Sequence, residues 1–236
     1  MSAHRRLEMT GSGLLRADRK SAKWRHLWGD GAASLVKPAV LMVDVDGVVV
    51  RHPDPSGWSA CIEDDLGIQR LALQARFFKP CWDDIIHGRA ALRDRLAPAL
   101  AEIAPHVSCD QLISYWFEGD AHLDEALLVQ LAEVRGAGVP LHLATVQEHE
   151  RASYLWNTLR LRDRFDDMHY AAQLGVSKPS QDFYAAVEQR VGLPASAIAF
   201  IDDTEKNVEA ARVRGWRAAL WTPGATLSSL IPELNH

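Results

Sequence analysis

Cysteine is scarce in this sequence, and the few cysteines form no recognisable pair. Cys61, Cys81 and Cys109 are odd in number, and no CxxC motif occurs. This pattern argues against a disulfide framework and against a cysteine zinc site, and it fits a reducing compartment. We therefore expect a cytoplasmic protein.

Long apolar runs and a positive net charge are also lacking. The apolar runs are strand-length, far below the ~20 residues that a membrane helix needs. Asp and Glu total 31 against 26 Lys and Arg, so the formal net charge is −5. The chain therefore lacks the overall positive charge that is typical of proteins that bind nucleic acid. We expect neither a membrane nor a nucleic acid as partner, and either a monomer or a homodimer.

Several motifs of known cofactor sites are missing. No GxxxxGKS phosphate loop occurs, so nucleoside triphosphate binding is not indicated. The ten histidines include no HxH pair and no HExxH motif, which argues against zinc. His142 lies inside an apolar segment, and we expect it to be a core residue with satisfied polar atoms.

The first 37 residues differ from the rest of the chain. Residues 1–37 carry eight Lys and Arg against three acids, and their apolar periodicity is weak. We expect a basic, mobile extension. A targeting role is the alternative to a disordered tail or an over-extended start of translation, which we favour; the segment lacks the apolar core of a secretory signal.

From residue 38 onward, apolar strand patterns alternate with helical patterns. Helices are expected at residues 124–135, 148–159, 181–191 and 204–214. Strands buried on both faces and joined by helices predict an α/β fold with a doubly wound, Rossmann-like parallel sheet. The expected strands are residues 39–46, 139–145, 168–172, 197–203 and 217–222.

A long insertion interrupts this alternation. Residues 55–119 read as helices, expected at about 66–78, 83–103 and 109–119, so we assign 55–119 to a helical cap and residues 38–54 and 120–236 to the core.

The cap is rich in aromatic residues, including Trp82 and Trp116. Packing within the cap explains most of them, and we nominate these two tryptophans as substrate contacts.

Two carboxylates close the first strand. In VLMVDVDG (40–47), Asp44 and Asp46 lie two residues apart, so their side chains share one side of the strand. Ligands of open α/β sheets bind outside the carboxyl ends of the strands. Two close carboxylates need a cation or a proton, and their hard oxygens suit Mg²⁺. The alternative is an Asp-rich turn that caps a helix.

Other polar residues follow later strands. Asp202 and Asp203 close the strand before residue 204, where they also suit a helix N-cap. Thr145 ends another strand, and Lys178 precedes a helix, where a lysine is usually a solvated charge. Beside several carboxylates, however, Mg²⁺ and an ammonium would together allow an anionic phosphate to bind.

The ordered set DVDGV (44–48), Thr145, Lys178-Pro179 and IDDTEKN (201–207) resembles the haloacid dehalogenase superfamily of hydrolases, over roughly residues 38–222. The insertion resembles the superfamily's helical cap. FFKPCWDDIIHGRAA (77–91) together with FIDDTEKN is similar to the branch with sugar-phosphate phosphatases and the N-terminal phosphatase domain of epoxide hydrolases.

The resemblance implies roles for the carboxylates. Asp44 would attack phosphorus and form an aspartyl-phosphate, and Asp46 would act as general acid and then as general base. Mg²⁺ would be held by the Asp44 carboxylate, the Asp46 backbone carbonyl and Asp203.

The resemblance also implies roles for the remaining polar residues. Asp202 and Asn207 would orient the metal ligands. Thr145 and Lys178 would bind the transferring phosphoryl group. One departure is Val146, where this branch usually has Asn; activity would be reduced unless Gln147 compensates.

The expected function is a Mg²⁺-dependent phosphomonoester hydrolase acting on small phosphorylated metabolites, sugar phosphates first. Asp46 argues against dehalogenation, because a halide leaving group needs no proton whereas an alkoxide does. Two alternatives stay open: a phosphosugar mutase or phosphotransferase with the same residues, and a low-turnover binding or regulatory protein of the same fold.

Overall fold

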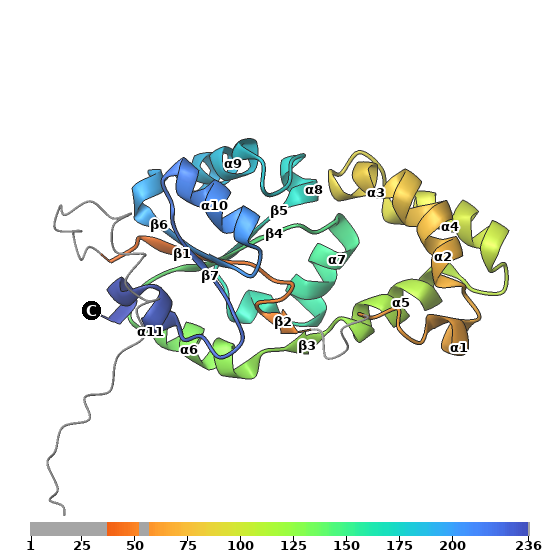
Figure 1. The fold of residues 1–236 in the computed structure, drawn as a ribbon, viewed down its shortest axis with the longest axis horizontal. Helices are drawn as coiled ribbons and strands as arrows, with labels where there is room; N and C mark the ends of the chain where they lie inside the picture. Colours follow the sequence, from red (N-terminus) through yellow and green to blue (C-terminus); the bar gives the residue numbers. More distant parts are fainter. Residues whose placement is uncertain (1–36, 52–56, 236) are drawn as a thin grey trace, which may run out of the picture. The chain divides into compact units, whose positions relative to one another are not determined.

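The computed structural model describes residues 37–51 and 57–235, so the predicted basic extension, apart from Lys37, and residues 52–56 lie outside the described part. The core is a parallel sheet in the order β5-β4-β1-β6-β7 (Figure 1). All five predicted strands are confirmed. They are β1 (Val40–Val43), β4 (Leu141–Thr145), β5 (Asp167–Tyr170), β6 (Ile198–Asp202) and β7 (Arg217–Leu220).

Alternating residues of the strands pack on opposite faces of the sheet. In β1, Leu41 and Val43 belong to one apolar cluster, and Val40 and Met42 to another. The first cluster includes residues of α6 (Glu125–Gly136), α7 (His149–Ser153) and α11 (Leu227–Leu230). The second includes residues of α9 (Gln181–Val191) and α10 (Glu205–Arg214). Helices therefore cover both faces, as a doubly wound sheet requires (Figure 1).

The helix boundaries follow local signals. The Ser180 hydroxyl accepts a hydrogen bond from the Asp182 N–H at the start of α9, and Gly192 ends this helix in the left-handed conformation. The four predicted core helices are present. The one expected over residues 148–159 continues from α7 into a π-helical turn, η3 (Tyr154–Thr158). Short elements that we did not predict are α8 (Ala171–Leu174), α11, η4 (Leu161–Asp163), η5 (Ala195–Ala197) and η6 (Pro232–Asn235).

The insertion is helical, and its buried residues form an apolar cluster of their own. The helix expected over residues 83–103 is wrong as a single element. It is interrupted after Ile86, because Gly88 adopts a φ of 69° that continues no right-handed helix. The elements are α1 (Ile62–Leu66), α2 (Arg70–Leu73), η2 (Gln74–Phe78), α3 (Lys79–Ile86), α4 (Leu92–Ile103) and α5 (Cys109–Gly119).

A small antiparallel sheet joins the two connections of the insertion. β2 (Val50–Arg51) pairs with β3 (His122–Leu123). The Arg51 guanidinium lies 2.7 Å from the buried Asp124 carboxylate, which also caps α6 by accepting from the Leu127 N–H. We did not predict this sheet, because two-residue strands have no readable period.

None of the helices in the described ranges has both the length and the apolar character that a membrane span needs.

Candidate active site

The loop after β1 places two carboxylates at the carboxyl edge of the sheet. The Asp44 N–H still donates to the Ile201 carbonyl at 3.0 Å, and the chain then turns at Gly47 with a φ of 76°. A Cβ at Gly47 would lie 1.9 Å from Oδ2 of Asp203. Glycine is therefore required here both for the turn and for the close approach of Asp203.

Lys178 points into this edge instead of into solvent. Its Nζ lies 2.9 Å from Oδ1 of Asp44 and 2.5 Å from Oδ2 of Asp202, and its side chain is 1% exposed. The loop between α8 and α9 carries it there. The solvated-charge alternative for this lysine is wrong, because a buried ammonium needs partners of this kind.

Asp202 lies behind Lys178 and fixes its position. It is fully buried, and it accepts hydrogen bonds from the Thr204 N–H at 2.8 Å and from Nδ2 of Asn207 at 3.0 and 3.1 Å. Its neighbour Asp203 is exposed and accepts from the Thr204 hydroxyl. Asp202 and Asp203 therefore have different positions: Asp202 orients Lys178, and Asp203 lines the cavity of the site.

Gln147 lies between Asp46 and Thr145 and contacts both. Its Nε2 donates to Oδ2 of Asp46 at 2.6 Å and lies 3.4 Å from Oγ1 of Thr145. Both Gln147 and Thr145 are buried. A side-chain amide, that of Gln147, therefore bonds Asp46 although position 146 is Val.

These residues surround one cavity of about 310 Å³. The nominated core residues come together here, with Asp202 just behind the lining. The cavity is lined by Asp44, Asp46, Gly47, Thr145, Val146, Lys178, Asp203, Thr204 and Asn207.

The charges of the site are unbalanced. Burial raises the pKa of the Asp44 carboxyl to about 7, with Lys178 acting in the opposite direction. Burial and the charge of Asp202 raise the pKa of Asp203. Burial lowers the pKa of Lys178, but Asp44 and Asp202 raise it by more, so the ammonium stays charged. One ammonium among the carboxyl groups of Asp44, Asp46, Asp202 and Asp203 leaves the site with an excess of negative charge.

The donor set fits a hard divalent cation. Asp44, Asp202 and Asp203 each offer a carboxylate oxygen, and the three oxygens lie within 4.8 Å of one another. Oxygen ligands of this kind are those that Mg²⁺ prefers. A divalent cation would compensate the excess negative charge.

The two nominated tryptophans lie within the aromatic cluster of the helical insertion. Trp116 is buried and stacks on Trp58 with ring centroids 5.1 Å apart, and Trp82 packs against it at 5.6 Å. Neither lines the cavity described above. Their role as substrate contacts stays a prediction.

Arg151 is a residue that we did not select from the sequence. It is buried in α7 and donates to the backbone carbonyls of Phe117 and Asp120, where the chain returns from the helical insertion. Its guanidinium also lies over the rings of Phe117 and Tyr154. Arg151 therefore ties the end of α5 to the core. A lone arginine in a helix gives no such signal, because its partners are backbone carbonyls over 30 residues away.

Two further contacts join the helices of the insertion to the core. The Arg93 guanidinium of α4 lies 2.9 Å from the Glu150 carboxylate of α7. The His87 imidazole, just after α3, lies 3.1 Å from the Ser177 hydroxyl, one residue before Lys178.

Comparison with known proteins gives a consistent result. The sequence profile described as haloacid dehalogenase-like hydrolase matches residues 38–215. No curated protein matches the sequence significantly. Solved structures with the same fold include a HAD family enzyme from Bacteroides thetaiotaomicron in complex with magnesium (TM-score 0.70, 18% identity, covering 83% of this chain and 98% of that one).

Two further structures extend the comparison. One is a predicted HAD-like family hydrolase from Porphyromonas gingivalis (TM-score 0.65, 19% identity, 85% of this chain and 99% of that one). The other is a 2-haloacid dehalogenase from Pseudomonas syringae (TM-score 0.61, 20% identity, 84% and 98%). At these identities the likeness shows the fold alone.

Proposed function

The chain belongs to the haloacid dehalogenase-like hydrolases, and we propose that it is a Mg²⁺-dependent phosphomonoesterase. The observation that carries the proposal is the convergence of Asp44, Asp46, Lys178 and Asp203 on one cavity at the carboxyl edge of the sheet. The substrates would be small phosphorylated metabolites, sugar phosphates first.

Mg²⁺ is the cofactor that suits this site. Asp44 and Asp203 would hold it through their carboxylates and Asp46 through its backbone carbonyl. The ion would supply charge stabilisation for the phosphoryl oxygens. A Bacteroides thetaiotaomicron enzyme of this fold has been crystallised with magnesium and inorganic phosphate, which supports the assignment.

The first half-reaction uses Asp44 and Asp46. A carboxylate oxygen of Asp44 attacks phosphorus, and the bond between phosphorus and the ester oxygen breaks. Asp46 gives its proton to the leaving oxygen, so an alcohol departs and an aspartyl-phosphate remains. Lys178 and Thr145 would bind the phosphoryl oxygens meanwhile, since positioning and charge stabilisation dominate phosphoryl transfer.

The second half-reaction reverses the role of Asp46. Its carboxylate takes a proton from water, and the water oxygen attacks phosphorus. The bond between phosphorus and the Asp44 oxygen breaks, which releases inorganic phosphate and restores both carboxyl groups. Gln147, which bonds Asp46, would hold this acid in place for both steps.

The choice of phosphate esters over haloacids rests on Asp46. An alkoxide leaving group needs a proton, whereas a halide does not. The cavity presents a second carboxyl group next to the nucleophile, which the chemistry of a haloacid would not require.

The test is release of inorganic phosphate from a panel of phosphomonoesters. We expect turnover with Mg²⁺, loss of turnover with a chelator, and no detectable turnover in Asp44→Asn. Asp83→Asn is the matched control, because Asp83 is an exposed acid on the cap helix α3. Undiminished turnover in Asp44→Asn would remove the covalent mechanism.

The same assay separates the alternatives. A phosphorylated product without free phosphate would indicate a mutase or phosphotransferase, whose acceptor the cap would select. Halide release from haloacids would overturn the phosphatase proposal. Failure with every ester, in the presence of bound Mg²⁺, would favour a binding or regulatory protein of the same fold.

A further inference from the structure

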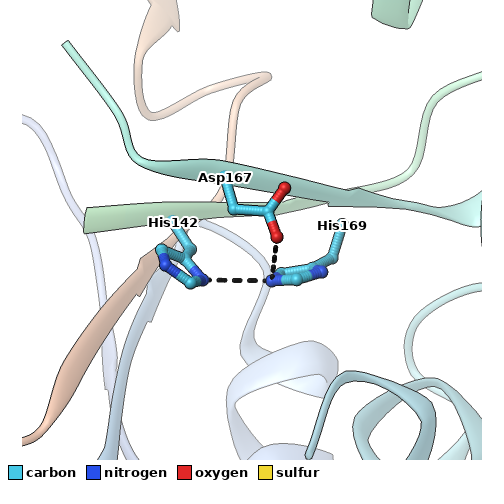
Figure 2. Close-up of side chains that lie close together, drawn as sticks. All are labelled: His142, Asp167 and His169. Carbon is cyan, nitrogen blue, oxygen red and sulfur yellow. Dashed lines mark hydrogen bonds and ion pairs between the residues drawn. The ribbon is translucent and has the colours of Figure 1, made fainter. Parts of the chain in front are cut away.

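Two histidines and an aspartate meet on strands β4 and β5, away from the active site. His142 lies near the start of β4, and Asp167 and His169 lie on β5 (Figure 2). In the sheet register Asp167 is the partner of His142, and His169 is two residues further along the same strand. Side chains two residues apart share a face of the strand, so register and period bring all three together.

The three side chains have the separation of ligands to one ion. Nδ1 of His142 lies 3.1 Å from Nε2 of His169, which lies 3.8 Å from Oδ2 of Asp167. Metal–nitrogen bonds of about 2.05 Å at a tetrahedral angle place two ligand nitrogens about 3.4 Å apart. All three donor atoms lie within 4.8 Å of one another, and in Figure 2 the dashed lines from His142 and Asp167 meet at Nε2 of His169.

From this geometry we propose that His142, Asp167 and His169 form a second cation site, specific for a borderline transition metal such as Zn²⁺. Two imidazoles and one carboxylate are the donors that zinc accepts, whereas Mg²⁺ prefers oxygen ligands alone. His169 is fully buried, His142 is half-buried, and the Asp167 side chain is 51% exposed. The ion would therefore enter from the Asp167 side.

The histidines are suited to bind a metal at neutral pH. Burial lowers the pKa of His169 to about 4, and burial also lowers the pKa of His142. Burial thus disfavours the charged form of each ring, and the neutral imidazole is the form that ligates metals. Oδ1 of Asp167 accepts from the Met168 N–H, so its other oxygen is the one turned to His169.

Two features limit the affinity. Nδ1 of His169 is buried without a hydrogen-bond partner among the described residues, whereas a ligating histidine normally donates its second N–H. The positive charge of Arg190 also acts on His169. We therefore expect Zn²⁺ to bind about 10–100-fold more weakly than at a site whose ligating histidines all donate their second N–H.

The site is independent of the proposed function. Thr145 of the active site follows His142 by three residues, so the two side chains point to opposite faces of β4. An ion here would join the edge strand β5 to β4, and its binding energy would add to the stability of the fold.

The test is a Zn²⁺ titration of the full chain in excess Mg²⁺, followed by competition with a chromophoric chelator. We expect one Zn²⁺ equivalent for the wild type, for Asp203→Asn, and for the control His106→Gln, an exposed cap histidine. Asp167→Asn and His142→Gln should each weaken this binding at least about 10-fold, since even an outer partner of a ligand is worth 10–100-fold.

Asp167→Asn keeps the test informative if His142→Gln unfolds, because the Asp167 side chain is half exposed. Zn²⁺, and not Mg²⁺, should also shift the imidazole NMR signals of His142 and His169. Equal zinc binding in the wild type and in Asp167→Asn, or imidazole signals that zinc does not move, would overturn the proposal. The contact would then be a plain hydrogen bond between two histidines.

Discussion

Single residues at the carboxyl edge of the sheet show how far a sequence pattern defines a site. Asp44, Lys178 and Asp203 could be selected from their places after strands and before a helix, and the structure brings them to one cavity. The partner of Asp46 could not be selected in the same way. Gln147 was a candidate only because position 146 is Val, and its 2.6 Å hydrogen bond depends on how the loop after β4 turns.

Replacing the proposed general acid should slow turnover according to the leaving group. For alkyl phosphates, Asp46→Asn should lower kcat/KM by ~10²–10⁴-fold, the usual contribution of a general acid–base group. An aryl phosphate with a strongly acidic leaving phenol needs less protonation, so its first step should lose much less. Burst kinetics with the two ester classes measure this difference. An equal loss for both would argue against proton donation by Asp46.

Gln147 should act through Asp46 and not through the substrate. In Gln147→Leu the hydrogen bond to Asp46 is lost, and we expect kcat to fall about 10-fold, which corresponds to one hydrogen bond of ~1.4 kcal/mol. KM should change little, because Gln147 is buried and does not line the cavity. Steady-state kinetics on one substrate separate the two constants. A large rise in KM with kcat unchanged would instead place Gln147 in substrate binding.

At the scale of helices and strands, the long periodic segments were predictable and the interruptions were not. The five core strands and four core helices follow from apolar runs, N-caps and glycines at helix ends. The break of the cap helix at Gly88 was missed, because residues 83–103 keep an acceptable helical composition across it. The cluster of His142 with β5 was also missed, because strand register and not spacing brings it together.

One hydrogen-bonded network joins three elements on the α9 side of the sheet. Glu188 of α9 accepts from Nη2 of Arg214 at 2.7 Å, at the end of α10, and from Nε1 of Trp216 at 2.8 Å, just before β7. The hydrogen bond from Arg214 is the main reason why the pKa of Glu188 lies below its usual value of 4.5. Stability from this group is therefore present above pH 4.5 and is lost as the pH falls through the lower, folded-state pKa.

Glu188→Gln should consequently destabilise the protein at pH 7 by about 1–2 kcal/mol, because a partly buried charged acceptor is replaced by a neutral one. Urea unfolding at a series of pH values measures this difference. The difference in unfolding free energy between wild type and variant should shrink as the pH falls below 4.5. The Glu188 carboxylate is then protonated, first in the unfolded state and at lower pH in the folded protein. Glu209→Gln, an exposed change on α10, should show no comparable difference. A difference for Glu188→Gln that is independent of pH would contradict the charge argument.

For the whole molecule, the fold class followed from the alternation of strands and helices, and the family from four motifs in a fixed order. The bounds assigned to the cap stay a prediction. The contacts that join the insertion to the core, the β2–β3 pair and Arg151, could not be predicted, because each connects residues far apart in the chain.

Mg²⁺ should stabilise the folded protein as a whole. A ligand that binds only the native state at 100 times its Kd adds about 2.7 kcal/mol. We expect thermal unfolding to shift upward with Mg²⁺ and to return with a chelator. Asp203→Asn should remove most of the shift, and the cap variant Asp83→Asn should keep it. A full Mg²⁺-dependent shift in Asp203→Asn would exclude Asp203 as a ligand.

The β2–β3 pair has a consequence for how such an enzyme can be rebuilt. Val50 is bonded opposite Leu123 and Arg51 opposite His122, so the chain leaves the core and comes back at adjacent points. A hairpin turn of about 2–5 residues spans that gap. Residues 52–121 could therefore be replaced by a turn or by another family member's insertion without altering the β1 loop, provided that Arg151 is changed as well, because it donates to the Phe117 and Asp120 carbonyls of this segment. Chimaeras made at this junction would exchange the segment that we expect to select the substrate and would keep the catalytic residues of the core.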